Sequence, residues 1–212
     1  LSAKNLTGLK TLTNIGGNLY FRSPYLTSVQ GMSKLESVGG GLYFEQGIGV
    51  TSLGPLGSIQ TWGAALGKKF PDARLTNPVN FTDLKGFSGF SRVNFLRFEN
   101  GLNKLQSTKD LTGIKQAAHF QFINTGVVKI EGMATLKTVD GSVTIKNNKK
   151  LQSVQVDGLT TAGSISIDGN HVLNSATFPS LTTGSLTVRT NNKLTALSLA
   201  KLTSANNLSV EK

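Results

Sequence analysis

The sequence predicts an all-β fold, a parallel β-solenoid of about nine coils of 21–24 residues. Three observations predict it. A short phrase recurs with this period, each copy alternates apolar and polar residues as a strand does, and a run of apolar residues spaced three apart precedes most copies. Because no single coil of this kind can bury its apolar side alone, the coils are expected to stack into one continuous core.

The repeated phrase reads GNLYF, GGLYF and GSLTV in its clearest copies, with an apolar residue at every second position. Its first apolar residue recurs at Leu19, Leu42, Leu66, Leu96, Phe120, Val143, Ile165, Leu186 and Leu208. Seven of the eight steps fall between 21 and 24 residues, and the step from Leu66 to Leu96 is 30. We therefore expect the third strand at the weak copy Ala65–Gly67, followed by a long coil, 67–93, with a protruding loop.

Two further patterns predict the rest of each coil. Apolar residues spaced three apart, as in Met32, Leu35 and Val38, fit a tight 3₁₀-like turn or an extended arc better than a long helix. Asn-rich turns follow the strands, at Asn100, Asn124, Asn147, Asn148, Asn170 and Asn191. Since amide side chains can hydrogen-bond backbone groups that strand pairing leaves unpaired, we interpret these Asn residues as structural.

Composition limits the classes of protein to consider. The 212 residues are expected to form a single solenoid domain, 1–212, whose ends show no polar cap, so that either a longer chain or a partner covers them. The absence of Cys and the presence of only two His disfavour thiolate chemistry and His-based metal sites, and we expect no cofactor. The formal net charge is +11. No apolar run approaches the roughly 18 residues of a transmembrane helix.

Several phrases resemble known repeat families. Leu186–Asn191 and Val143–Leu151, with the spacings Leu-x-Val-x-x-Asn and Val-x-Ile-x-x-Asn-x-x-Leu, resemble leucine-rich repeats. Gly31–Phe44 (GMSKLESVGGGLYF) is similar to the receptor L domain, and Phe178–Val188 (FPSLTTGSLTV) is similar to related repeats of fungal glycolipid-anchored cell-wall proteins. The resemblance covers nearly the whole chain and implies a right-handed β-solenoid, usually secreted or at the cell surface. Receptor L domains are stapled by Cys and have fewer coils, so no ligand residue is carried over from them.

The outward face of the expected main sheet divides into two halves. Its C-terminal half carries small polar residues. Its N-terminal half and the coil-three loop offer these binding candidates: Tyr20, Tyr43, Phe70, Phe81, Phe95, Arg97 and His119. Tyr20 and Tyr43 occupy equivalent positions, so their rings are expected to be neighbours, whereas Phe70 and Phe81 fit no position of the repeat. Outward aromatics beside a cation suit a protein-binding patch or a sugar-stacking platform. Alternatively, the loop folds over them as an internal cover.

Charged residues predict two further features. Outward positions near the strand ends alternate in sign between coils, as in Lys146, Asp168 and Arg189, which favours a self-neutralised ladder. A candidate basic stripe comprises Lys129, Lys146, Lys149, Lys150 and Lys193. Such a stripe either keeps the rod soluble or binds an anionic polysaccharide, an acidic protein or lipid headgroups. Nucleic acid is the least expected partner because no nucleic-acid-binding module accompanies these bases.

The function is weighed between three classes. We expect a non-enzymatic recognition or scaffold domain that binds a protein partner, or else a glycan, through the N-terminal half of the sheet face and the coil-three loop. The alternative is a structural linker subunit of a larger assembly or cell wall. A carbohydrate-active β-helix enzyme is disfavoured because the acidic residues are scattered. The expected location is extracellular, at the cell surface or in an organelle lumen. The sequons at Asn5, Asn80 and Asn207 agree with this location but arise often by chance in such a chain.

Overall fold

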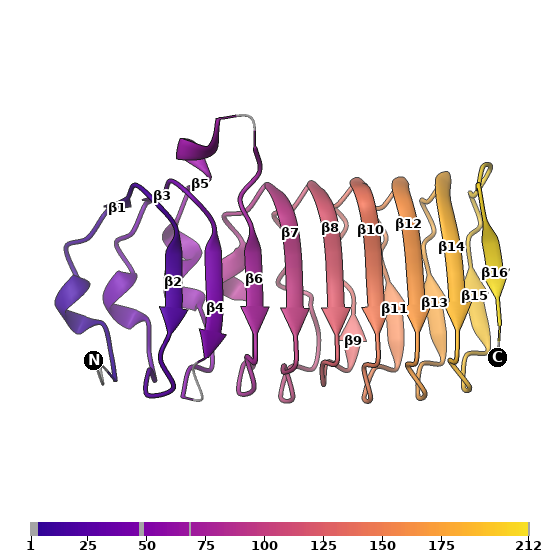
Figure 1. Ribbon diagram of the computed structural model, residues 1–212, viewed down its shortest axis with the longest axis horizontal. Coiled ribbons are helices and arrows are strands. Elements are labelled where there is room, and N and C mark those ends of the chain that lie inside the picture. The colour runs from indigo at the N-terminus through magenta and orange to yellow at the C-terminus, as the bar shows by residue number, and fades with distance from the viewer. Residues whose placement is uncertain (1–3, 47–48, 68, 212) are drawn as a thin grey trace.

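The computed structural model describes residues 4–46, 49–67 and 69–211, and it shows a parallel β-solenoid (Figure 1). Within this part of the chain, nine strands form the main sheet and enclose eight complete turns, one fewer than the nine coils expected. In chain order they are β2 (Leu19–Arg22), β4 (Leu42–Gln46), β6 (Ala73–Thr76), β7 (Arg92–Glu99), β8 (Gln116–Ile123), β10 (Thr138–Lys146), β12 (Thr161–Asp168), β14 (Thr183–Arg189) and β16 (Leu208–Val210). In Figure 1 these strands point downward in front, and the chain rises behind them while it advances, so the coil is right-handed.

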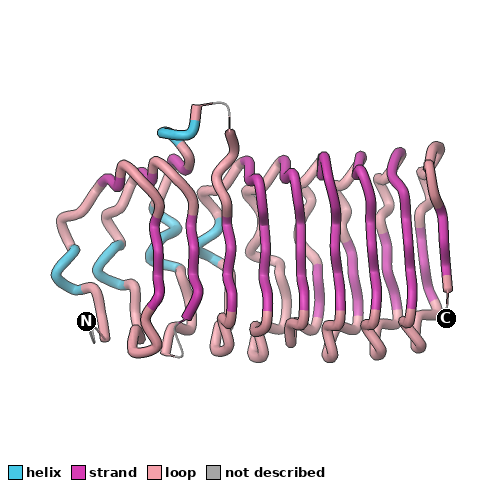
Figure 2. The backbone as a smooth tube through the Cα atoms, viewed as in Figure 1, coloured by secondary structure: helices cyan, strands magenta, loops and turns pink. Residues whose placement is uncertain are grey.

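The back of the solenoid changes character along the rod (Figure 2). In the N-terminal half, the described coils carry the 3₁₀ helices η1 (Thr7–Leu9), η2 (Gln30–Met32), η3 (Gly54–Ser58) and η5 (Lys85–Phe87). The coils of η1, η2 and η3 also form a short sheet of β1 (Asn14–Ile15), β3 (Ser37–Val38) and β5 (Thr61–Trp62). In the C-terminal half, a different sheet is formed by β9 (Lys129–Ile130), β11 (Ser153–Gln155), β13 (Ser175–Thr177) and β15 (Ala196–Ser198). Both expected forms of the arc, 3₁₀ turn and extended segment, occur in the N-terminal coils, since Met32 lies in η2 and Val38 lies in β3.

Stacked apolar side chains from successive coils form one continuous core. The register pairs Leu19 with Leu42 and Leu42 with Ala73, so that equivalent residues lie next to one another, and all three are buried. Phe98 and Phe122 are paired in the same way, with ring centroids 4.7 Å apart. Because parallel strands lie about 4.8 Å apart, like side chains contact like side chains and bury the face that a single coil would expose.

The Asn-rich turns form two columns with different roles. One column has a left-handed backbone with positive φ, which Asn tolerates better than most residues, at Asn77, Asn100, Asn124 and Asn147. A second column points inward as a buried ladder. Oδ1 of Asn170 accepts hydrogen bonds from the backbone N–H and the side-chain amide of Asn148, at 2.9 and 3.0 Å, and Nδ2 of Asn170 donates to the carbonyl of Ile145 at 2.9 Å. The predicted hydrogen bonds from Asn side chains to backbone groups are confirmed for Asn148, Asn170 and Asn191.

The third coil departs from the prediction. Its main-sheet strand is β6, whose Ala73 pairs with Leu42, 31 residues earlier. The strand expected at Ala65–Gly67 is therefore wrong. Ala64–Leu66 is instead the 3₁₀ helix η4, in a loop between β5 and β6 that rises above the main sheet in Figure 1. The extra residues precede the third strand rather than follow it, so the protruding loop coincides with only the beginning of the expected long coil, 67–93.

Candidate ligand-binding face

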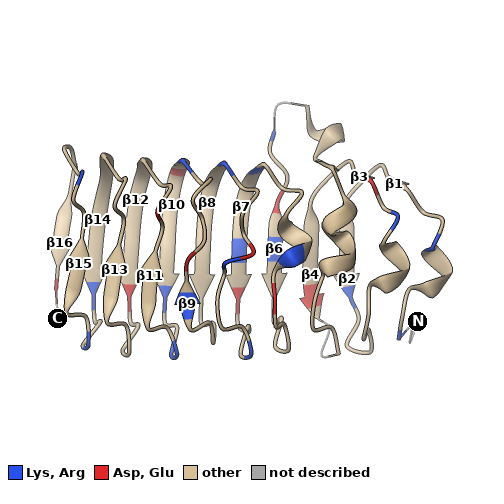
Figure 3. Cartoon of the chain, turned by 180° about the vertical axis from the view of Figure 1, so that it is seen from behind, with Lys and Arg blue, Asp and Glu red and all other residues tan. Residues whose placement is uncertain are grey.

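Charged side chains alternate along the outward side of the main sheet, near the carboxyl ends of its strands. Figure 3 shows this alternation from β10 to β16. Lys146 Nζ lies 3.3 Å from Asp168 Oδ2, and Arg189 Nη2 lies 3.1 Å from Glu211 Oε1. All five ion pairs found among the described residues lie on this face. The predicted ladder is confirmed, and the carboxylates in it are bound to bases rather than gathered into a pair suited to general acid–base catalysis.

Two tyrosines form an exposed aromatic surface at the N-terminal end of this face. Tyr20 of β2 pairs with Tyr43 of β4, and their rings stack with centroids 4.6 Å apart and 17° between the ring planes. The predicted contact between the two rings is confirmed. Tyr20 is 58% exposed, and Tyr43 is half-buried. The alternative in which the loop covers these aromatics therefore does not hold for Tyr20.

Asp72 links Tyr43 to the neighbouring strands. Its Oδ2 accepts a hydrogen bond from the Tyr43 hydroxyl at 2.9 Å and lies 2.9 Å from Arg74 Nη2, and its Oδ1 accepts from Asn94 Nδ2 at 3.0 Å. Burial raises the pKa of Tyr43 to about 12, and the hydrogen bond to Asp72 together with its negative charge adds to this effect. The Tyr43 phenol is therefore a neutral donor at physiological pH, held in one orientation by Asp72.

A second pair of stacked rings lies two strands further along. Phe95 of β7 and His119 of β8 stack with centroids 4.5 Å apart, and the Arg74 guanidinium lies 4.3 Å from the centroid of the Phe95 ring. His119 Nδ1 accepts from the backbone N–H of Ser142 at 3.3 Å and lies 3.0 Å from the Ser142 hydroxyl. The sequence reasoning missed this His–Ser contact. Because a backbone N–H is fixed in direction, the contact orients the imidazole against Phe95.

A hollow of about 370 Å³ lies between the Tyr43 side of the face and the protruding loop. Its lining residues are Asn18, Gly41, Tyr43, Leu66, Lys69, Phe70, Asp72 and Asn94. Lys69 and Phe70 also line a second hollow, of about 550 Å³, together with Trp62 and Arg92. The Arg92 guanidinium lies 5.6 Å from the centroid of the Phe70 ring. Phe70 therefore contributes to two adjoining cavities, and its predicted place in the loop is confirmed.

Two other predicted members of the site have different surroundings. Phe81 is fully buried and packs edge-on against Phe44, with ring centroids 5.1 Å apart, so its assignment to the binding surface is wrong. Arg97 lies on the face as expected, but it donates to Glu99 Oε2 through Nε and Nη2, at 3.1 and 2.7 Å. This pairing leaves Arg97 less free to contact a ligand than the sequence implied.

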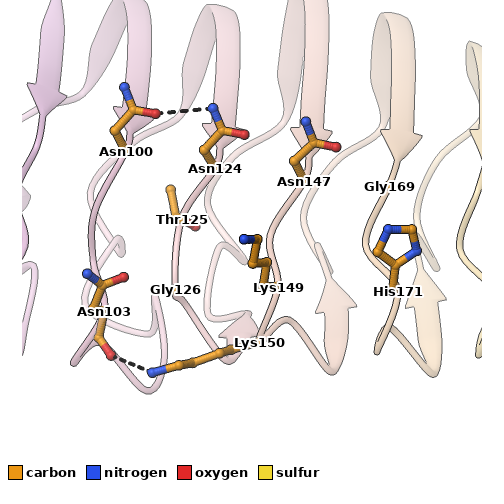
Figure 4. A pocket seen from close by; sticks show the side chains of 10 residues that line it. All are labelled: Asn100, Asn103, Asn124, Thr125, Gly126, Asn147, Lys149, Lys150, Gly169 and His171. Atoms are coloured by element: carbon orange, nitrogen blue, oxygen red, sulfur yellow. Dashed lines mark hydrogen bonds between the residues drawn. The ribbon is translucent and has the colours of Figure 1, made fainter.

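The predicted basic stripe separates into two parts. Lys146 pairs with Asp168, and Lys129 lines neither of the two hollows in this region. Lys149 and Lys150 line both hollows, which have volumes of about 550 and 440 Å³, and Lys193 lines the second. Around the first hollow, Figure 4 also shows the side chains of Asn100, Asn103, Asn124, Thr125, Asn147 and His171.

The described residues contain neither a candidate metal site nor a membrane-spanning helix. Within residues 4–46, 49–67 and 69–211, no group of three or more His, Asp or Glu could hold a metal ion. Across the same ranges, no helix is long and apolar enough to span a membrane. No protein-family model matches the chain, and no curated protein matches its sequence.

Proposed function

We propose that this chain is a non-enzymatic recognition domain that binds a neutral glycan on the N-terminal half of its main-sheet face. The main observation behind the proposal is the stacked pair of exposed Tyr20 and half-buried Tyr43, beside a hollow lined by Phe70, Asp72 and Asn94. Ligand sites commonly combine aromatic walls with a few fixed polar groups. This surface supplies both, and its strands hold them rigidly.

The tyrosine pair provides the apolar contact. One face of a pyranose ring consists largely of C–H groups, which pack against a flat aromatic ring as other apolar groups do. Tyr20 stacks on Tyr43 through part of its ring, and its 58% exposure leaves the rest open to a ligand. Because Tyr43 already restricts Tyr20, binding costs little further side-chain freedom.

The hollow provides hydrogen-bonding groups that suit sugar hydroxyls. The Asp72 carboxylate is already bound by the Tyr43 hydroxyl, the Arg74 guanidinium and the Asn94 amide. It therefore orients its partners rather than presenting an unpaired charge. Asn94 and Asn18 also line the hollow with amides, which can both donate to and accept from a hydroxyl group, and Asn18 is held in place by its bonds to the Gly41 N–H and the Tyr20 hydroxyl. Although Lys69 also lines the hollow, the amides and the paired carboxylate favour a polyol as the ligand.

A titration with linear neutral oligosaccharides tests the proposal. Gluco-, chito- and manno-hexaoses are added to the purified protein in isothermal titration calorimetry. Tyr43→Ala removes half of the ring stack and should weaken binding by roughly 1–3 kcal/mol, the usual size for an aromatic anchor. Tyr20→Ala should weaken it as well, and it leaves the Asp72 hydrogen bond in place.

The matched control is Thr187→Ala, at the equivalent outward position of β14. It should bind the oligosaccharide as the wild type does. Equal losses in the Thr187 and Tyr20 variants would contradict the proposal, and so would a lack of binding by all three hexaoses. Circular dichroism of each variant separates loss of binding from loss of fold.

The repeats resemble those of receptor L domains, which are usually secreted or at the cell surface. We therefore propose that this surface acts outside the cell or in an organelle lumen. A protein segment is the alternative ligand for the same face, since Tyr and Arg also dominate protein interfaces. A pull-down from native extract with the wild type and with Tyr20→Ala separates the two ligands. A protein retained only by the wild type, together with a failed sugar titration, would favour the protein partner.

A structural role in a larger assembly is the second candidate, and one observation favours it. In the described part of the chain, β16 pairs on one side only, with β14. Its apolar Leu208 and Val210 are 58% and 60% exposed. An open strand edge with apolar side chains readily accepts another strand, whether from a further coil of the same chain or from a partner. Sedimentation over a range of protein concentrations tests this role: growth in apparent size supports it, and a constant monomer argues against it.

A further inference from the structure

Two adjoining hollows lie along the turns that follow the main-sheet strands, away from the tyrosine pair. They have volumes of about 550 and 440 Å³ and share Lys149 and Lys150, and Lys193 lines the second. We call the two together the basic turn groove. No Asp or Glu is present among the described residues that line either hollow. The groove therefore presents positive charge in a concave surface, where the electrostatic potential is concentrated.

The protein does not neutralise the lysines of this groove. No ion pair of the described ranges includes Lys149, Lys150 or Lys193, in contrast to Lys146, which pairs with Asp168. All three side chains are exposed. The Lys150 ammonium donates to the backbone carbonyl of Asn103 at 3.1 Å, a bond that reaches across two coils (Figure 4). This bond fixes a positive charge along the groove without cancelling it.

Amide side chains from successive coils complete the groove. Asn103, Asn124 and Asn147 line the first hollow, and Asn124 Nδ2 donates to Asn100 Oδ1 at 3.1 Å (Figure 4). Asn124 and Asn147 share the left-handed backbone of the turn, with φ of 54° and 56°. Because coils repeat about every 4.8 Å, their amides form a regular row of donors and acceptors. Such a row suits a polymer whose hydroxyl groups also recur at short intervals.

The lining distinguishes among polyanions. Apart from the His171 imidazole, the described lining residues are without an aromatic ring, so there is no platform for stacked bases. The same residues offer no aromatic or Arg anchor of the kind that dominates protein interfaces. We propose that the basic turn groove binds an anionic polysaccharide, whose sulfate or carboxylate groups contact the lysines while its hydroxyls contact the Asn amides.

Dextran sulfate and dextran test this proposal because they share one sugar backbone and differ in charge. Dextran sulfate should bind near physiological ionic strength and weaken steeply as salt is raised, since exposed charges are screened. Joint replacement Lys149→Gln, Lys150→Gln and Lys193→Gln should weaken its binding roughly tenfold or more, because hydrogen bonds to charged groups are the strong ones. Dextran should show no dependence on these three lysines.

The matched control removes the same charge elsewhere. Lys4→Gln, Lys10→Gln and Lys34→Gln replace exposed lysines of the first coils and should keep wild-type affinity for dextran sulfate. Equal weakening in both triple variants would show that net charge, not the groove, binds the polymer, and would overturn the proposal. A lack of dextran sulfate binding would also overturn it. So would duplex DNA that binds as tightly with the same dependence on Lys149, Lys150 and Lys193.

Discussion

Replacing Asn170 by Ala tests whether the buried amide ladder holds successive turns together. Asn170 is fully buried, and its Oδ1 is the acceptor for the backbone N–H of Asn148. The substitution leaves this N–H unpaired inside the protein, which costs about 1–3 kcal/mol. It also removes the hydrogen bonds to the Ile145 carbonyl and the Asn148 side chain, each of which contributes about 1 kcal/mol. The expected loss of unfolding free energy is therefore about 3–5 kcal/mol.

Urea denaturation followed by circular dichroism measures this loss. Asn192→Ala is the matched control because Asn192 is exposed in a neighbouring turn, and it should change the unfolding free energy by less than about 0.5 kcal/mol. Asn170→Asp should also destabilise the fold, since a carboxylate cannot donate to the Ile145 carbonyl. A loss below about 1 kcal/mol for Asn170→Ala, or a loss equal to that of the control, would refute the structural role of the ladder.

Three further predictions test the stack and the tyrosine pair. Deleting residues 143–164 removes one turn because Val143 pairs with Ile165. This variant should remain a folded but shorter rod, whereas deletion of 143–153 removes half a turn and should unfold the protein. Circular dichroism and small-angle scattering measure both outcomes. Val143→Asp places an unpaired charge at a buried position and should cost several kcal/mol in urea denaturation. Folding raises the pKa of Tyr43 from 10.0 to about 12, so its contribution to stability is complete below pH 10 and is lost as the pH rises through 12. Tyr43→Phe should therefore flatten the dependence of unfolding free energy on pH between 10 and 12.

A different experimental result would contradict each of these three predictions. Unfolding by both deletions would contradict a stack of equivalent turns, and a tolerated Val143→Asp would contradict burial of that strand position. A Tyr43→Phe profile identical to that of the wild type would show that the Tyr43 phenol is not the group that titrates above pH 10.

The strands of regular coils could be predicted from the sequence because their alternation and spacing are preserved. The third coil could not, since β6 reads Ala73-Arg74-Leu75-Thr76 without the preceding Gly, and an insertion shifts it along the chain. Phe81 was misplaced for the same reason. It follows Ala73 by eight residues, as buried Leu151 follows Val143, so the register that places β6 also places Phe81 in the core.

Contacts that depend on which residues pair between neighbouring strands could not be predicted from the sequence pattern. Asp72 meets Tyr43 and Asn94 only because the next residue, Ala73, pairs with Leu42 on one side and with Leu96 on the other, which depends on the correct third strand. The exposed tyrosine pair was predictable, since both residues occupy the same position of clear repeats. The basic stripe was predictable as a set of lysines, but their division between the ion-pair ladder and the turn groove depends on three-dimensional distances.

Recognition of a neutral glycan by the tyrosine face is tested by an NMR titration of the ¹⁵N-labelled protein with the hexaose that binds best. We predict dose-dependent shifts of the backbone amides of Tyr20, Tyr43 and Asn94, with no shift at Thr187. Shifts confined to Thr187 and other residues of the C-terminal coils, or no shifts at saturating sugar, would contradict the account.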